Sequence, residues 1–402
     1  MLSPIPVQHE VVGAEYAFLN SSVQKDSAVY DSLRVQLSRH LPRMIPRIRD
    51  ELAASIDSTF GLDTEWSEVC IYTLVRGVTV RNSQSLCTDD ELVENLSKFS
   101  TSVIPSAIAL SLFPPLLKPF TSRLTSIFNH IYMRRALKIL SPHIERRIIA
   151  VENGLLKDLP QDDVLNWHIH EALRKKEPRF EMADVIACRV FATVFAALES
   201  TTLTMTYALF NVCASNPSTQ VWQALEEEAL AVFPTNLDET SLNVLYVADS
   251  VIKETLRLNT AIKALSVEVM HEDGPKIKDR MIHLPQGARV SISAWGIHHD
   301  QDIYPNAYAF DPFRFVPLHN GEGIQDTNSL VTPSEIYVPF GLGKHSCPGR
   351  QFAAVVTKVF VAYLAVNYDL EEVHEKPRFL SLGHLPVPPV RAKLRVRRKP
   401  SE

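Results

Sequence analysis

One stretch near the C-terminal end combines the residue types that hold a reactive cysteine thiolate. Positions 340 to 350 read FGLGKHSCPGR, with Cys347 in the second half. A cysteine binds metal as its thiolate, which hydrogen-bond donors, positive charge or a helix N-terminus stabilise. Gly343 and Gly349 allow backbone conformations that turn peptide N–H groups toward the sulfur, and the helical run from Gln351 places a helix start directly after the cysteine. This spacing favours a metal-binding thiolate over a free loop thiol.

Two further patterns place polar side chains where they could do chemistry. Glu254 and Arg257 lie three positions apart in a helical run, so they share a face and can pair. Such a pair on a surface is worth only about 0.3 to 0.5 kcal/mol. Glu199 and Ser200 interrupt a long apolar helical run. Because an acid is costly to bury among apolar residues, this pair indicates a functional role rather than a polar residue tolerated in a core helix.

Together these patterns resemble the cytochrome P-450 superfamily, in the form found in its fungal microsomal members. The family signature is carried by Phe340, Gly343, Cys347 and Gly349. This combination should arise by accident in about one chain in a thousand of this length. The resemblance covers about 16–398 and is strongest from Glu181 onward. It implies a mainly α fold with small β-sheets, in which a haem lies between a long central helix and the cysteine loop with its following helix.

The resemblance also implies roles for residues of the cysteine loop. Cys347 would be the axial ligand of the iron in haem b. Phe340 would pack against the proximal side of the haem, and His345 would meet a haem propionate. Gly343 and Gly349 would shape the loop around the sulfur.

Outside the loop, the family has a buried triad of one Glu and two Arg. Glu254, Arg257 and Arg314 match it, and their role would be to fix the geometry of the loop. The family also has an oxygen-activation segment of small residues, an acid and an alcohol in its long helix. The match is Ala196-Ala197-Leu198-Glu199-Ser200-Thr201, in which Glu199, Ser200 and Thr201 would be catalytic by supplying protons to dioxygen.

The chain departs from the family pattern in three places. Ser200 stands where most members have Thr, which keeps the hydroxyl but loses the methyl that restricts its rotamers. Compared with the family pattern, we expect the sequence to lack much of the usual N-terminal region, including the membrane helix, a proline-rich hinge and much of the first β-sheet. The segment after Leu258 is short, and Lys263 is the only Lys or Arg between Thr260 and Gly274, where the family often places an Arg for a propionate.

The composition is that of an ordinary globular protein that buries a sizeable core. The chain has 402 residues, of which 46% are hydrophobic and 22% charged, with a net charge of −5, and nothing in it indicates a nucleic-acid partner. Its cysteines form an odd set without a C-x-x-C pair, so neither a disulfide framework nor a structural zinc site is expected. They are Cys70, Cys87, Cys188, Cys213 and Cys347. This pattern favours a reducing compartment.

The chain shows no signal-peptide pattern or apolar run long enough to span a membrane. Its most apolar stretches, 103–120 and 185–212, are interrupted by prolines or charged residues. The family is anchored in the endoplasmic-reticulum membrane. We therefore expect this chain to be cytoplasmic or peripheral at that membrane.

Hydrophobic periodicity predicts the elements that must position these residues. Helices are expected over 30–56 and 123–151, where Pro42, Pro46 and Pro142 should kink or divide them. Further helices are expected over 181–214, from Pro217, over 244–258 and over 351–366. Short strands are expected over 282–284 and 288–294 on either side of a tight turn, with an irregular region over 300–346 and an edge strand over 390–398.

The leading interpretation is a single P-450 domain over 1–402 that inserts one atom of dioxygen into a lipophilic small molecule. Electrons would come from NADPH through a separate NADPH-cytochrome reductase. Resemblance to fungal members favours a terpenoid or related secondary metabolite as substrate. Two alternatives stay open. A haem-thiolate isomerase or dehydratase would need no reductase, and the Glu199–Ser200 pair argues against it. A truncated product without catalysis is favoured by the missing N-terminal region.

Overall fold

The computed structural model describes residues 2–19, 28–82, 89–155, 163–233, 237–277, 282–317, 329–382 and 385–400. The chain forms two compact units, each built from three separate stretches of sequence. Unit 1 contains Met1–Leu37, Ser83–Glu199 and Leu265–Ile292, and unit 2 contains Ser38–Asn82, Ser200–Ala264 and Ser293–Glu402. The expectation of a single domain over 1–402 stays a prediction.

Unit 1 is a helical layer with a small sheet. Its helices are α1 (Ile5–Val11), α2 (Ala14–Ala17), α5 (Asp90–Ser111), α6 (Lys118–Thr125), α7 (Ile127–Glu152), α8 (Val164–Arg174) and the first part of α9, with the 3-10 turn η2 (Pro115–Leu117). Helix α5 begins after Asp89, whose carboxylate accepts the N–H of Leu92 at 2.9 Å. Helices α5 and α7 pack along each other and supply much of the core of this unit.

Helix α9 (Arg179–Cys213) is the longest helix of the described residues, and its residues belong to unit 1 up to Glu199 and to unit 2 from Ser200 onward. Most of its side chains are buried, as the sequence predicted for a helix with little polar face. It ends before Asn216, whose side chain caps the 3-10 turn η4 (Pro217–Thr219), and α10 (Val221–Val232) follows. The predicted long helix and the start of a new element at Pro217 are confirmed.

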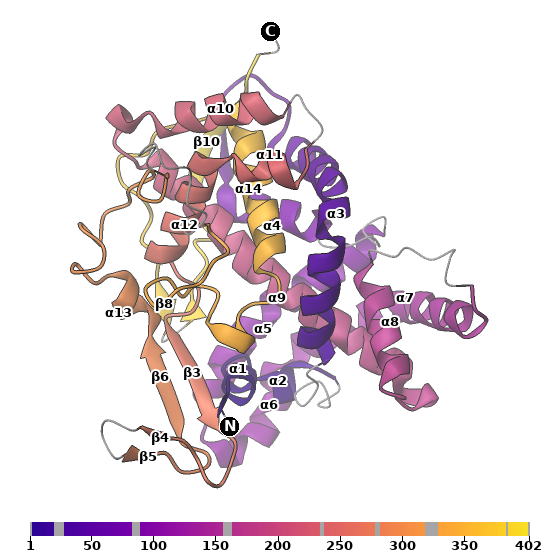
Figure 1. Ribbon diagram of the computed structural model, residues 1–402. Helices are drawn as coiled ribbons and strands as arrows, with labels where there is room; N and C mark the ends of the chain where they lie inside the picture. Colours follow the sequence, from indigo (N-terminus) through magenta and orange to yellow (C-terminus); the bar gives the residue numbers. More distant parts are fainter. Residues whose placement is uncertain are drawn as a thin grey trace. The chain divides into compact units, whose positions relative to one another are not determined.

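Unit 2 contains most of the segments around the cysteine loop. Besides α10 it holds most of α3 (Ala28–Phe60), α4 (Ile71–Asn82), α11 (Glu239–Asn243), α12 (Tyr246–Leu258), α13 (Ala294–His298), α14 (Arg350–Asn367) and the 3-10 turn η7 (Gly343–His345). Helices α10, α12 and α14 pack against one another (Figure 1). The helix predicted after the cysteine loop is therefore present as α14.

The prolines that were predicted to kink or divide the helices do not divide them. Helix α3 continues through Pro42 and Pro46, and α7 continues through Pro142. A proline removes one intrahelical hydrogen bond, but burial of apolar side chains such as Ile45 and Ile48 holds the helix on both sides of it.

Two three-stranded and two two-stranded sheets complete the described chain. The first sheet has the order β1 (Leu2–Ser3), β3 (Ala264–Val269), β6 (Arg289–Ser293), and β3 and β6 lie side by side in Figure 1. The two-stranded sheets are β4 (Lys276–Ile277) with β5 (Ile282–His283), and β8 (Ser381–Leu382) with β9 (Leu385–Pro386). The strands predicted on either side of the turn at 285–287 are β5 and β6, which belong to different sheets.

The C-terminal strand is a central strand, so the predicted edge strand is wrong. β10 (Lys393–Arg398) lies between β2 (Ser67–Cys70) and β7 (Tyr368–Leu370), antiparallel to both. Its basic side chains pair with acids from both sides rather than facing water alone. The pairs are Lys393 with Glu68 at 2.6 Å, Arg395 with Glu371 at 3.1 Å and Arg397 with Asp369 at 2.8 Å. Cross-strand charge pairing offsets the repulsion within the basic strand.

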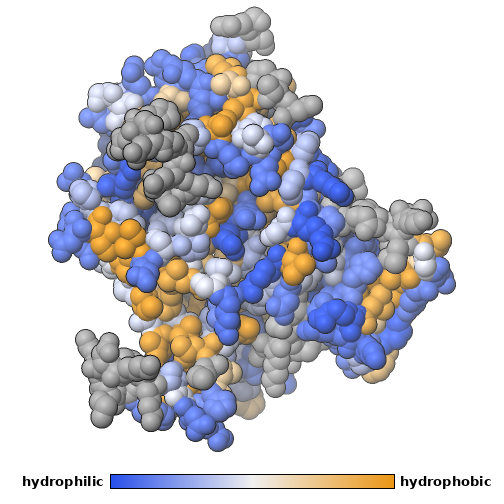
Figure 2. Space-filling view, viewed as in Figure 1, coloured by the Kyte–Doolittle hydropathy of each residue, from blue (hydrophilic) through white to orange (hydrophobic). Residues whose placement is uncertain are grey.

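Hydrophilic residues cover most of the face drawn in Figure 2, with apolar residues between them, as is usual for folded proteins. Among the helices of the described ranges, none combines the length and the apolar character required to cross a membrane. The described cysteines Cys70, Cys188, Cys213 and Cys347 are free thiols, and Cys87 lies outside the described residues.

Candidate active site

The cysteine loop is held by backbone hydrogen bonds. The N–H of Cys347 donates to the carbonyl of Phe340 at 2.7 Å, and the N–H of Ser346 donates to the carbonyl of Gly343 at 3.1 Å. Gly341 and Gly343 have φ values of 72° and 62°. These left-handed conformations favour glycine, and they close the loop so that Cys347 stands just before α14.

Two opposing effects act on the Cys347 thiol. Burial is the larger effect and leaves the pKa of Cys347 above its ordinary value, whereas peptide N–H groups of Gly349 and Arg350 and the positive charge of Arg350 partly offset it. The guanidinium of Arg350 is fixed near the sulfur because its Nη1 donates to the Cys347 carbonyl at 3.1 Å. By contrast, burial raises the pKa of Cys213 to about 12. Of these two cysteines, Cys347 is the one with donors and a cation directed at the sulfur.

The glycine-specific backbone conformation expected at Gly349 is wrong. Its φ is −91° and its ψ is 5°, a conformation that other residues adopt, so no left-handed backbone is needed there. Gly349 instead serves through its peptide N–H. Two residues of the loop were expected to face the haem. Phe340 is half-buried, and His345, which is the last residue of the turn η7, is exposed.

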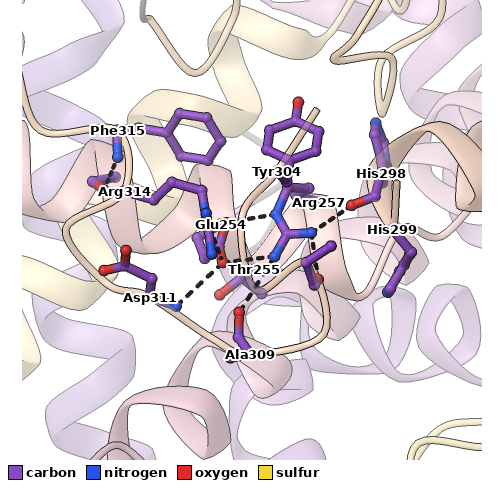
Figure 3. Close-up of polar contacts among 12 residues, drawn as sticks. Glu254, Thr255, Arg257, His298, His299, Tyr304, Ala309, Asp311, Arg314 and Phe315 are labelled. Carbon is purple, nitrogen blue, oxygen red and sulfur yellow. Dashed lines mark hydrogen bonds and ion pairs between the residues drawn. The ribbon is translucent and has the colours of Figure 1, made fainter. Parts of the chain in front are cut away.

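Glu254 and both arginines expected to pair with it form one buried network, shown in Figure 3. Glu254 and Arg257 are fully buried and pair through both carboxylate oxygens, at 2.7 and 2.8 Å. Nε of Arg314 donates to the same carboxylate at 3.1 Å. The N–H of Asp311 adds a fourth donor at 3.2 Å. A buried carboxylate is stable only when its oxygens are saturated in this way.

Arg257 also binds the backbone of the irregular segment before the cysteine loop. Its guanidinium donates to the carbonyls of His298, Ala307 and Ala309, the last two at 2.7 and 3.4 Å. It also lies over the ring of Tyr304, 4.9 Å from the centroid (Figure 3). Glu254, Arg257 and their partners thus hold α12 against residues 298–315. No sequence pattern signalled these carbonyl acceptors, because any residue type can supply them.

The residues of the predicted proton-transfer segment differ in burial along α9. Thr201 is buried, Glu199 is half-buried and Ser200 is exposed. Ala192 and Ala196 precede Ser200 at four-residue spacing and are also partly or fully exposed. Between Val185 and Cys213, small side chains therefore mark the least buried stripe of the helix.

A partner of Glu199 that sequence reasoning missed is Ser100 on α5. The Ser100 hydroxyl donates to Oε1 of Glu199 at 2.6 Å. A serine in a helix is too common a feature to have signalled this contact. The Thr204 hydroxyl, also missed, donates to the carbonyl of Ser200 at 2.9 Å within α9.

The donor set at Cys347 fits a thiolate ligand to haem iron. Such a ligand must be deprotonated, and the two N–H groups, the Arg350 charge and the start of α14 all favour the charged form of the sulfur. Among the described residues, Nε of Arg350 is a buried donor without a hydrogen-bond partner, which leaves a polar atom beside the loop for a further group. This arrangement, together with the buried network on α12, is the one expected of a haem-thiolate protein.

Comparison with known proteins identifies the family. Residues 38–396 match the family model of cytochrome P450. The chain therefore belongs to the cytochrome P450 family and is an oxidoreductase of the monooxygenase type. This membership implies a haem with thiolate-ligated iron.

Curated fungal relatives agree with this assignment. Cytochrome P450 monooxygenase 151 of Postia placenta is 30% identical, over 86% of this chain and 70% of the relative. Cytochrome P450 monooxygenase fumoB of Cordyceps fumosorosea is also 30% identical, over 91% of this chain and 69% of the relative. Cytochrome P450 monooxygenase gloO of Glarea lozoyensis is 27% identical, over 88% and 70%.

A solved structure shares the fold. The retinoic acid-bound cyanobacterial CYP120A1 superposes with a TM-score of 0.62 at 22% identity, and the match covers 92% of this chain and 78% of that chain. The predicted mainly α fold with small sheets is confirmed.

Proposed function

We propose that this P450 monooxygenase oxidises a lipophilic small molecule, with a terpenoid or related fungal secondary metabolite as its substrate class. The observation that carries the proposal is the Cys347 thiol, which meets two peptide N–H groups and the Arg350 charge at the start of α14. The apolar composition of α9 around its stripe of small residues supports a lipophilic substrate. The curated relatives are fungal monooxygenases, which supports the substrate class.

Haem, when bound, supplies the iron at which dioxygen is activated. Cys347 would hold it through the sulfur, and the N–H groups of Gly349 and Arg350 would stabilise the thiolate. Phe340 would cover the proximal side and His345 would donate to a propionate. The network of Glu254, Arg257 and Arg314 would keep the loop in place, a geometric role rather than a source of net stability.

On α9, Glu199 would carry protons and Ser200 would pass them on, with Thr201 helping to order the segment. In monooxygenation one oxygen atom enters the substrate and the other leaves as water, which consumes two electrons and two protons. A half-buried acid beside an exposed hydroxyl is suited to deliver protons one at a time to a site that otherwise excludes water.

The electrons would come from NADPH through a separate NADPH-cytochrome reductase. We also propose that the protein is peripheral at the endoplasmic-reticulum membrane. Support comes from an unusual run of exposed apolar side chains between the end of α5 and the start of α7. They are Leu112, Phe113, Leu116, Leu117, Phe120, Leu124, Ile127 and Phe128. Lys118 and Arg123 lie within this run and would favour an anionic lipid surface.

A reduced carbon-monoxide difference spectrum, followed by a reconstituted assay, tests the proposal. We expect a thiolate-type spectrum, and then product from a terpenoid panel only when NADPH, reductase and dioxygen are all present. Product without NADPH and reductase would instead indicate an isomerase or dehydratase. Absence of the thiolate-type spectrum would leave a chain without haem-dependent catalysis.

A further inference from the structure

Ser100 lies in the middle of α5, and its side chain is completely buried. Four other hydroxyl residues of this helix donate to carbonyls of the helix itself, as serine and threonine usually do. These residues are Thr101, Ser102, Ser106 and Ser111. The hydroxyl of Ser100 instead leaves its own helix and donates to Oε1 of Glu199 on α9 at 2.6 Å. A short, charge-assisted bond of this kind fixes the direction of the carboxylate.

Aromatic packing on both sides keeps the two helices in register at this bond. Phe99, next to Ser100, meets Phe191 of α9 edge-to-face, with ring centroids 5.1 Å apart. Phe99, Val103, Phe191 and Val194 all belong to one buried cluster. Because these side chains interlock, Ser100 cannot move away from Glu199 without opening the core of unit 1.

Glu199 lies at the border between two faces of α9. Phe191 and Phe195, which precede it by two turns and one turn, pack in the cluster shared with α5. Ala196 and Ser200 lie on the adjoining, exposed stripe. The bond from Ser100 holds Oε1 of Glu199 toward α5.

We propose that Ser100 is a positioning residue for proton delivery: it holds the Glu199 carboxylate in a defined resting orientation from which protons reach the exposed stripe. The inference rests on the proposed role of Glu199 as proton carrier. Without the hydroxyl, the carboxylate would lose its bond to α5 and shift from this orientation, and protons would arrive out of step with the electrons from NADPH. Dioxygen that gains two electrons and two protons without transferring an atom leaves as hydrogen peroxide.

The test compares Ser100→Ala, Ser100→Cys and Ser100→Thr in the holoenzyme. Cys keeps the approximate volume but is a weak donor, so it serves if Ala fails to fold, whereas Thr keeps the hydroxyl. The matched control is Ser106→Ala, which removes another buried hydroxyl of α5. That hydroxyl accepts from Asn129 at 2.8 Å and donates to α5 rather than to α9.

The first readout does not depend on turnover. Isotope-labelled glutamate and subtraction of the Glu199→Gln spectrum identify the infrared carboxylate band of Glu199. We expect this band to shift in Ser100→Ala and Ser100→Cys, to stay close to its original position in Ser100→Thr and to be unchanged in Ser106→Ala. An unchanged band in Ser100→Ala and Ser100→Cys would overturn the proposal.

The second readout is product and peroxide formed per NADPH. We expect Ser100→Ala to lower the rate of product formation by about tenfold to a hundredfold, as small misplacements of reacting groups do, with a matching rise in peroxide and unchanged haem content. Ser100→Thr should recover most of the coupling, and Ser106→Ala should match the parent enzyme. Normal coupling in Ser100→Ala would also overturn the proposal.

A double-mutant cycle separates a role through Glu199 from a general effect on the fold. In a Glu199→Ala background, Ser100→Ala should cause no further loss of coupling. Additive losses would refute positioning through Glu199. If the parent protein forms no product with NADPH and reductase, the proposed function itself fails, and the infrared shift still reports the hydrogen bond. If the parent is coupled and the Ser100 variants match it, only this inference fails.

Discussion

At the scale of single residues, Cys347 is distinguished by its surroundings rather than by its residue type. Burial alone would keep the thiol protonated, as it does at Cys213. Peptide N–H groups of Gly349 and Arg350 and the Arg350 guanidinium act in the opposite direction and offset part of the effect of burial on the pKa of Cys347. An iron ion adds a further strong preference for the thiolate. Ligation therefore depends on the loop that aims these donors as much as on the cysteine.

Cys347→Ala is expected to abolish the thiolate-type carbon-monoxide spectrum, because no other described cysteine has this arrangement of donors. Replacing Cys70, Cys188 or Cys213 by Ala should leave the spectrum intact. The measurement is the reduced difference spectrum of each purified variant. A thiolate-type spectrum from Cys347→Ala would contradict the assignment of the ligand.

Ser200→Ala should leave haem content and substrate binding nearly unchanged while product per NADPH falls and peroxide rises. Glu199→Gln should slow turnover further, since general acid–base groups contribute about a hundredfold or more in rate. Both predictions are tested in one reconstituted assay that measures NADPH consumed, peroxide formed and product formed. An unchanged ratio of product to NADPH in Ser200→Ala would show that Ser200 has no role in proton delivery. In an isomerase, activity would persist without NADPH and peroxide would not form.

At the scale of elements, the network on α12 joins a helix to a segment without regular structure. Residues 298–315 form short turns that are closed by local backbone hydrogen bonds, such as that from the N–H of Tyr304 to the carbonyl of Asp300 at 2.9 Å. Arg257 ties these turns to α12 by donating to three carbonyls, while Glu254 accepts from Asp311 and Arg314 (Figure 3). The buried charges therefore help to fix the path of this segment, which leads toward the cysteine loop.

Glu254→Ala or Arg257→Ala should each yield little haem-containing protein. Removal of one partner leaves an uncompensated buried charge, which costs about 3 to 5 kcal/mol. The matched control is Glu371→Ala, which breaks the exposed pair with Arg395 and should cost at most about 1 kcal/mol. Haem content and yield of soluble protein are the measurements. Full haem in both α12 variants would show that the network is dispensable for the loop.

At the scale of the whole molecule, stability should depend on pH through His298. Burial, together with the positive charge of Arg257, lowers the pKa of His298 from 6.5 to about 4. Its Nε2 accepts the N–H of Val338 at 3.0 Å, which requires this nitrogen to be unprotonated. The unfolded chain binds the proton more readily than the folded chain. The stability contribution is therefore complete above about pH 6.5 and declines as the pH falls toward 4.

The free energy of unfolding of the part that contains His298 should fall by about 3 kcal/mol on this acidification. His298→Gln keeps an acceptor for the Val338 N–H but does not titrate in this range, so it should lose less stability on acidification. Thermal unfolding of both proteins between about pH 7 and about pH 4.5 measures the difference. Identical pH dependence in the two proteins would rule out His298 as the titrating group.

Local patterns were enough for the features that depend on neighbours in sequence. The cysteine loop, the pairing geometry of Glu254 and Arg257, and the run of small residues before Glu199 follow from spacing of a few positions. The same holds for the long helix α9 and for α14, because helical periodicity is a local property. These features sufficed to recognise the family.

What depends on partners distant in sequence was decided only by the tertiary structure. β10 is a central strand because β2 pairs with it from the other end of the chain, and no pattern within 390–398 records that. α3 survives Pro42 because buried neighbours hold it, and Arg257 binds carbonyls that any residue type would supply. The contact of Ser100 with Glu199 joins positions 99 apart. Sequence alone determined which groups could do chemistry here, whereas folding determined which atoms hold them, because hydrogen bonds and packing act through space rather than along the chain.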